Sequence, residues 1–135
     1  MSLPTDLESL LCQAYQEELE CYTQALELAQ GIAAAFQRGE ADNDRLLQLR
    51  GFLDGITVIE AGISDAKRRW QAGGQKPGPK FQGLLDQVKQ LIEQLAALSR
   101  TAESAAFLNK ERLAPQLDSL AQGQRMQRSY HLWRL

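Results

Sequence analysis

The sequence has few of the residues that most enzyme and metal sites need. Its 135 residues include one histidine, His131, and two cysteines, Cys12 and Cys21. A di-iron helical bundle needs paired Glu-x-x-His motifs and a zinc site needs a second pair of ligands, so neither centre can form. A nucleophile assisted by histidine is nearly excluded for the same reason, and neither phosphate-binding glycine pattern occurs. We therefore expect a protein that is not an enzyme and uses no cofactor or metal.

Long apolar runs and an excess of one charge are also missing. No stretch approaches the ~18 apolar residues that a membrane span requires, and the first residues lack the basic start and apolar core of a signal peptide. A net charge of −2 creates no overall field that would hold nucleic acid. On one helix, Cys12 and Cys21 would lie about 13 Å apart along the axis, which is too far for a disulfide. Reduced thiols favour a cytoplasmic location.

The first helix is predicted over residues 5–38. Thr5 and Glu8 have the spacing of a capping box, with Pro4 just outside it. Residues at alternating spacings of four and three then form one stripe, of which only Glu18 is polar. The stripe comprises Leu7, Leu11, Ala14, Glu18, Cys21, Ala25, Leu28, Ile32 and Ala35, and is widened by Leu10, Tyr22, Ala29 and Phe36.

Two further helices are predicted, over residues 43–71 and 80–122. Gly39 is suited to end the first helix and Asp42 or Asn43 to begin the second, while the glycines and prolines of residues 72–79 form a hairpin loop. The second helix contains Gly51, Gly55 and Gly62, which indicate either close contacts with a neighbouring helix or a helix of low rigidity.

Together these features predict an all-α fold. We expect one domain over residues 1–135, an elongated antiparallel three-helix bundle with a kinked or broken C-terminal helical extension. Pro115 kinks or breaks the third helix, and residues 123–135 are expected to form a flexible tail.

Several charged and thiol groups have an ordinary structural interpretation. Glu17, Glu18 and Glu20 are interpreted as a solvated face rather than an acid–base pair, and both cysteines as small apolar residues in or beside the stripe. The basic cluster Lys67–Arg69, with Lys76 and Lys80, favours a helix end that complements the helix dipole over an anion site. Trp70 lies on the apolar stripe, so we expect it in the core.

The C-terminal third has more apolar residues than three helices need to cover. Leu108, Leu113, Leu117 and Leu120 continue a stripe beyond the bundle, which suggests helix-in-groove binding or a dimer interface. In the tail, large apolar residues alternate with arginines, and docking onto the bundle and exposure to a partner are equally favoured. These tail residues are Met126, Tyr130, Leu132, Trp133 and Leu135.

Over residues 5–122 the chain resembles the FlgN-type flagellar export chaperones, with the FliT-type chaperones as looser relatives. The resemblance rests on three groups of residues. These are Leu10-Leu11 with Glu17-Glu18-Leu19; Phe36–Glu40 followed by Leu46–Arg50; and Phe107-Leu108-Asn109 followed by Leu113 and Leu117.

The resemblance implies a cytoplasmic chaperone that binds unassembled hook–filament junction proteins and delivers them to the type III export apparatus. It also implies client binding through the C-terminal helical region, which adds Asn109 to the apolar residues above. The predicted partner-binding set is therefore Leu108, Asn109, Leu113, Leu117, Leu120, Met126, Tyr130, Leu132 and Trp133. Two alternatives stay open: a helical dimerisation or scaffold module without a client, and an anion- or nucleic-acid-binding bundle.

Overall fold

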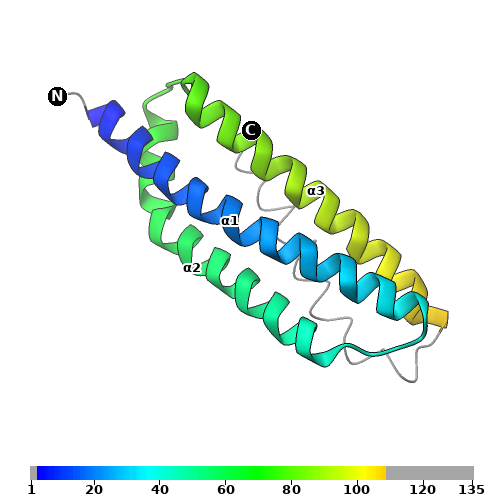
Figure 1. Cartoon of the computed structure of the whole chain (residues 1–135). Helices are drawn as coiled ribbons and strands as arrows, with labels where there is room; N and C mark the ends of the chain where they lie inside the picture. Colours follow the sequence, from blue (N-terminus) through cyan, green and yellow to red (C-terminus); the bar gives the residue numbers. More distant parts are fainter. Residues whose placement is uncertain (1–2, 109–135) are drawn as a thin grey trace.

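The computed structural model describes the backbone of residues 3–108 and the side chains of residues 7–108. This part of the chain forms three α-helices, α1 (Leu3–Gln37), α2 (Asn43–Ala72) and α3 (Pro79–Leu108), and contains no strand. The helices lie side by side along a common direction, with α1 between α2 and α3 (Figure 1). The predicted all-α three-helix bundle is confirmed, whereas the predicted C-terminal extension and the Pro115 kink lie outside the described residues.

The start of α1 differs from the prediction. The helix begins at Leu3, so Thr5 lies within its first turn and the predicted capping position is wrong. Pro4 is tolerated there because the first N–H groups of a helix have no acceptor within it. Glu8 instead accepts a hydrogen bond from the backbone N–H of Gly78 at 3.2 Å, which joins α1 to the loop between α2 and α3.

The turn between α1 and α2 follows the predicted pattern. Gly39 has a φ of 71°, and the N–H of Glu40 donates to the carbonyl of Ala35 at 2.9 Å, so the last carbonyls of α1 are satisfied. Asp42 begins α2 by accepting a hydrogen bond from the N–H of Arg45 at 3.1 Å. Burial raises the pKa of Asp42, but the hydrogen bonds and charge of Arg45 outweigh it, so the net pKa is lowered.

The core is a seam with alternating spacings of four and three on each helix. On α1 the seam consists of Leu11, Tyr15, Glu18, Tyr22, Ala25, Ala29, Ile32 and Phe36. Its facing residues include Leu49, Leu53, Ile56 and Ile63 of α2, and Leu85, Val88, Ile92 and Leu95 of α3. Tyr15, which the sequence prediction omitted, is 1% exposed, whereas Cys21 and Leu28 are only half-buried at the edge of the seam.

The three helices do not contribute equally to the packing. Helix α1 packs along its length against both α2 and α3, while α2 and α3 have few direct backbone approaches to each other. Near the loop end, Phe81 of α3 meets Trp70 edge-on at 5.4 Å between ring centroids and Tyr15 at 5.9 Å. This aromatic layer joins all three helices, and its buried Trp70 confirms the predicted core position.

The glycines of α2 do not mark close helix contacts. A Cβ atom added at Gly51, Gly55 or Gly62 would meet no other heavy atom within 4 Å, so that interpretation is wrong. Gly31 of α1 differs, because an added Cβ would lie 2.7 Å from the side chain of Arg45. Glycine within a helix costs about 1 kcal/mol relative to alanine, so the open glycines weaken α2 without a packing benefit.

Candidate partner-binding surface

The predicted partner-binding set falls largely outside the described residues. Leu108, the last residue of α3, is its one member within them, and it is 83% exposed. The remaining members, Asn109, Leu113, Leu117, Leu120, Met126, Tyr130, Leu132 and Trp133, lie outside the described part of the chain. The described residues therefore bring no two members of the set together, and the predicted partner-binding surface stays a prediction.

Phe107 adds a second large apolar side chain to this end of α3. It is 71% exposed, whereas the preceding Ala105 and Ala106 are buried against the bundle. Phe107 and Leu108 therefore form an exposed apolar pair, to which we refer as the α3-end pair. The prediction of individual site residues omitted Phe107. The seam spacing could have shown that it lies off the core, because Phe107 is outside the alternating spacing of Ser99, Ala102 and Ala106.

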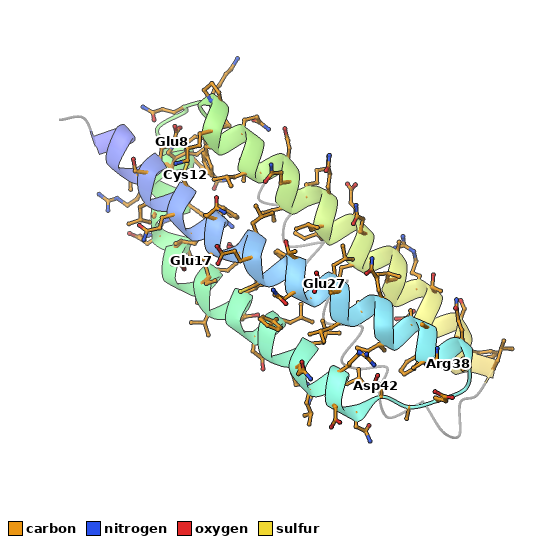
Figure 2. The ribbon with its side chains drawn as sticks, in the orientation of Figure 1. Glu8, Cys12, Glu17, Glu27, Arg38 and Asp42 are labelled. Carbon is orange, nitrogen blue, oxygen red and sulfur yellow. The ribbon has the colours of Figure 1, made fainter. Side chains whose placement is uncertain are left out.

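The α3-end pair lies at the same end of the bundle as the turn between α1 and α2 (Figure 1). Charged residues of that turn are paired: Arg38 with Glu40 at 3.3 Å and Arg45 with Asp42 at 2.5 Å. Figure 2 shows Arg38 and Asp42 at this end, while Glu8, Glu17 and Glu27 are spaced along the rest of α1. The α3-end pair and these paired charges therefore share one end of the bundle.

Other exposed large apolar residues are scattered. Leu10 of α1 is 48% exposed, and Leu47 and Val58 of α2 are 68% and 71% exposed. Leu47 and Val58 are separated by three turns of helix. The residues three and four positions away from each of them on α2 are polar or small. Single apolar side chains of this kind are normal on a protein surface. Among the described residues, only Phe107 and Leu108 are exposed large apolar residues that are adjacent in sequence.

The basic cluster at the end of α2 is largely neutralised by carboxylates of its own helix. The Nζ atom of Lys67 lies 2.8 Å from an oxygen of Glu60, and both Arg68 and Arg69 pair with Asp65. These pairs leave less positive charge for a phosphate than the sequence suggests, although exposed pairs are individually weak. The geometry therefore gives little support to an anion site at Lys67–Arg69.

A polar cluster with a buried Glu18 and a half-buried Glu60 and Lys67 is the main feature that the sequence interpretation missed. Glu17 and Glu20 are exposed as predicted, but Glu18 is 2% exposed and belongs to the seam. It faces Glu60 of α2, which also accepts the hydrogen bond from Lys67. The predicted solvated position of Glu18 is therefore wrong, because its place in the seam determines its burial more than its acidic neighbours do.

The two carboxyl groups of this cluster have opposite pKa shifts. Burial, followed by the hydrogen bond and charge of Glu60, raises the pKa of Glu18 to about 11. Burial also raises the pKa of Glu60, but hydrogen bonds with Glu18, Lys67 and Tyr15 and the charge of Lys67 outweigh it, so the net pKa is lowered. Glu18 is thus protonated beside an ionised Glu60.

Both cysteines are free thiols of low reactivity. Cys12 is buried and Cys21 half-buried, which places them in and beside the seam as expected. Burial raises the pKa of both thiols, with further contributions from Glu8 at Cys12 and from Glu20 and Glu17 at Cys21, while Lys80 partly opposes the shift at Cys12. A raised pKa leaves little of the reactive thiolate at neutral pH.

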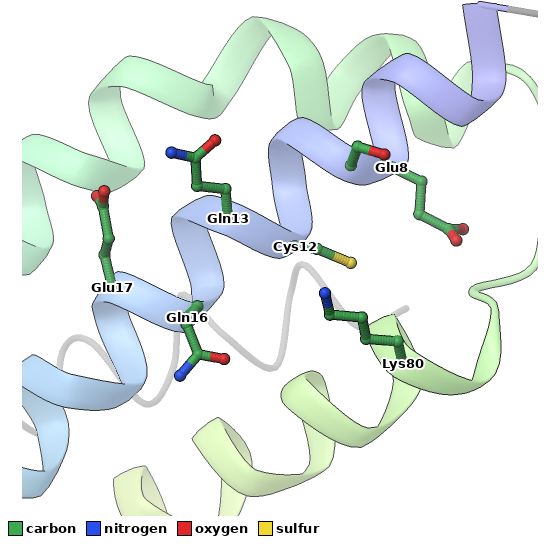
Figure 3. A pocket seen from close by; sticks show the side chains of 7 residues that line it. Glu8, Cys12, Gln13, Gln16, Glu17 and Lys80 are labelled. Atoms are coloured by element: carbon green, nitrogen blue, oxygen red, sulfur yellow. The ribbon is translucent and has the colours of Figure 1, made fainter.

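A cavity of about 440 Å³ opens between the start of α1 and the start of α3. Its lining includes Cys12, Gln13, Gln16 and Glu17 of α1 and Lys80 of α3, and Figure 3 shows the Lys80 side chain reaching toward Cys12. Glu8, at the rim, already accepts the hydrogen bond from Gly78. The lining joins single polar groups of both charges and does not define one class of ligand.

The described residues contain no group of three or more His, Cys, Asp or Glu side chains arranged to hold a metal ion. Over the same residues, no helix is long and apolar enough to cross a membrane. Comparison with known proteins found no family model, curated protein or solved structure that matches the chain.

Proposed function

We propose that the chain is a flagellar export chaperone that holds an unassembled hook–filament junction protein and delivers it to the export apparatus. The exposed α3-end pair carries this proposal, because its residues belong to the motif that resembles the FlgN-type family. Phe107 and Leu108 are 71% and 83% exposed, immediately before the part of the sequence that contains the spaced leucines.

The bundle suits a protein that acts by binding alone. Three long helices bury a continuous seam, and the α3-end pair lies at the end of one of these helices. Aromatic and large aliphatic side chains supply much of the energy at protein interfaces when a partner covers them. An amphipathic client helix that packs against this end would bury both residues under its apolar face.

The proposal is tested by capturing partners from a lysate of the source organism. The bait is the full-length chain, compared with a Phe107→Ala and Leu108→Ala double variant and with a chain lacking residues 124–135. A matched control is the Leu47→Ala and Val58→Ala double variant, which removes two other exposed apolar side chains, both from α2. We expect the full-length bait and the α2 control to retain a hook–filament junction protein. The α3-end variant should retain at least tenfold less of it, and the chain lacking residues 124–135 should also lose it.

Two outcomes would contradict the proposal. If no flagellar or export component is enriched while the client is expressed, the flagellar assignment fails. If the α3-end variant and the α2 control retain the client equally, the α3-end pair is not the binding surface. Circular dichroism melting of each bait separates lost binding from lost folding.

The second candidate is a self-associating helical module in which the α3-end pair contacts another copy of the chain. The same exposed pair favours it, because a symmetric dimer could cover both copies at once. Sedimentation at several concentrations distinguishes the two functions. A tight dimer that the Phe107→Ala and Leu108→Ala variant dissociates would favour self-association, and a monomer would leave the pair available to a client.

A further inference from the structure

The contact between α1 and α2 contains two acids and one base. Glu18 of α1 is 2% exposed and meets Glu60 of α2, whose Oε1 atom accepts a hydrogen bond from Lys67 at 2.8 Å. The Oε2 atoms of both Glu18 and Glu60 are buried and accept no hydrogen bond from a donor of the described residues. Two neighbouring carboxyl groups therefore each have a buried oxygen that lacks a donor.

The charge balance of Glu18, Glu60 and Lys67 indicates that one proton is bound between the two carboxyl groups. If both acids were ionised, the cluster would hold two negative charges and the single positive charge of Lys67. An excess charge is disfavoured at Glu18, which is 2% exposed, and half-buried Glu60 supplies no compensating positive charge. One proton between the carboxyl groups removes the excess charge and also supplies a donor for the buried oxygens.

We propose that Glu18 and Glu60 form a single-proton clasp between α1 and α2, so that separating the two helices releases one proton to solvent. Glu18 carries the proton and donates it in a hydrogen bond to Glu60. Lys67 favours the ionised form of Glu60 through its hydrogen bond to the Oε1 atom. The clasp couples the α1–α2 contact to proton binding.

The other helix that packs on α1 supplies no counter-ion that would replace the proton. The contact of Tyr15 with Phe81 shows which residues of α1 and α3 lie side by side along the bundle axis. Alongside this part of α1, α3 contributes buried apolar residues, and the titratable side chains of the same segment are the exposed Asp86 and the half-buried Lys89. The apolar residues are Leu84, Leu85 and Val88. On α1 itself, Cys21 adds a weak effect in the direction that favours the proton.

The clasp predicts how stability depends on pH. In the unfolded chain Glu18 ionises near its ordinary pKa, whereas in the folded chain burial and Glu60 raise the pKa to about 11. The contribution of the clasp is complete below the unfolded pKa and is lost as pH rises toward the folded pKa. Between these values, unfolding releases one proton, so the unfolding constant gains about a factor of ten per pH unit.

The test compares the full-length protein with a Glu18→Gln variant, whose amide can still donate to Glu60 but does not titrate. Chemical unfolding is measured from about pH 5.5 to about pH 7.5, below the range in which thiols ionise. We expect the unfolding constant of the unmodified protein to rise about 100-fold more than that of the variant over this range. Glu17→Gln, which changes the exposed neighbouring acid, should retain the full dependence.

A second measurement does not depend on the variant being folded. Infrared spectroscopy of the unmodified protein near neutral pH should show the C=O stretching band of one protonated carboxylic acid, and Glu17→Gln should keep it. In Glu18→Gln the band should disappear. The proposal is overturned if the unmodified protein lacks this band, or if it and a folded Glu18→Gln variant show the same dependence of unfolding on pH.

Discussion

Trp70 and Phe107 are aromatic residues near opposite ends of the bundle. We expect Trp70 to contribute to the stability of the fold and Phe107 to contribute to client binding instead. Trp70 is 7% exposed and packs on Phe81, so Trp70→Ala should lower the free energy of unfolding by about 3–5 kcal/mol. Phe107 is 71% exposed, so Phe107→Ala should change it by no more than about 0.5 kcal/mol. Urea denaturation followed by circular dichroism measures both. A large loss in Phe107→Ala would show that this side chain supports the fold and would weaken its proposed role in client binding.

Individual residues show where sequence reasoning succeeds and where it stops. Spacing alone predicted that Trp70 is in the core and that Glu18 lies on the apolar stripe, and both positions are confirmed. The environment of Glu18 could not be predicted, because its partners Glu60 and Lys67 belong to the next helix and no local pattern links them to it. The adjacent exposed Glu17 and the nearby exposed Glu20 instead suggested a solvated face.

At the scale of one element, the glycines of α2 are sites at which the protein can be stabilised. Gly51 and Gly62 are exposed helical residues, and an added Cβ would meet nothing within 4 Å. Gly51→Ala and Gly62→Ala should each raise the free energy of unfolding by about 0.5–1 kcal/mol, because alanine loses less backbone entropy on folding. Thermal and chemical denaturation of the single and double variants measures the gain.

Gly39→Ala is the matched control for these substitutions. Gly39 has a φ of 71°, a conformation that disfavours any side chain, so the same replacement should destabilise the protein there. If Gly51→Ala and Gly62→Ala were also destabilising, the open surface of α2 would have to be covered by something outside the described residues.

The elements were more predictable than their ends. Apolar spacing gave three helices, and glycine and aspartate positions gave the turn between α1 and α2, since local conformational preferences govern both features. The start of α1 was predicted at Thr5 but lies at Leu3. The hydrogen bond from Gly78 to Glu8 arises from a contact between distant parts of the chain, which the capping pattern of Thr5 and Glu8 cannot reveal.

At the scale of the whole molecule, α1 is the element on which the other two depend. It packs on both α2 and α3, whereas those two helices have few direct backbone approaches to each other. Backbone hydrogen exchange is slowest where local opening must break the most packing. We therefore expect the amides of the α1 seam to exchange most slowly, and those around Gly51 and Gly55 of α2 to exchange fastest among the central turns of the helices.

Hydrogen exchange followed by mass spectrometry or NMR tests this order, and the glycine variants sharpen it. Gly51→Ala with Gly62→Ala should slow exchange in the central turns of α2 and leave α3 nearly unchanged, because α2 and α3 are joined chiefly through α1. Equal slowing in α2 and α3 would mean that they open as one unit. The bundle would then behave as a single cooperative body, in which α1 would not be the element that connects two separately opening helices.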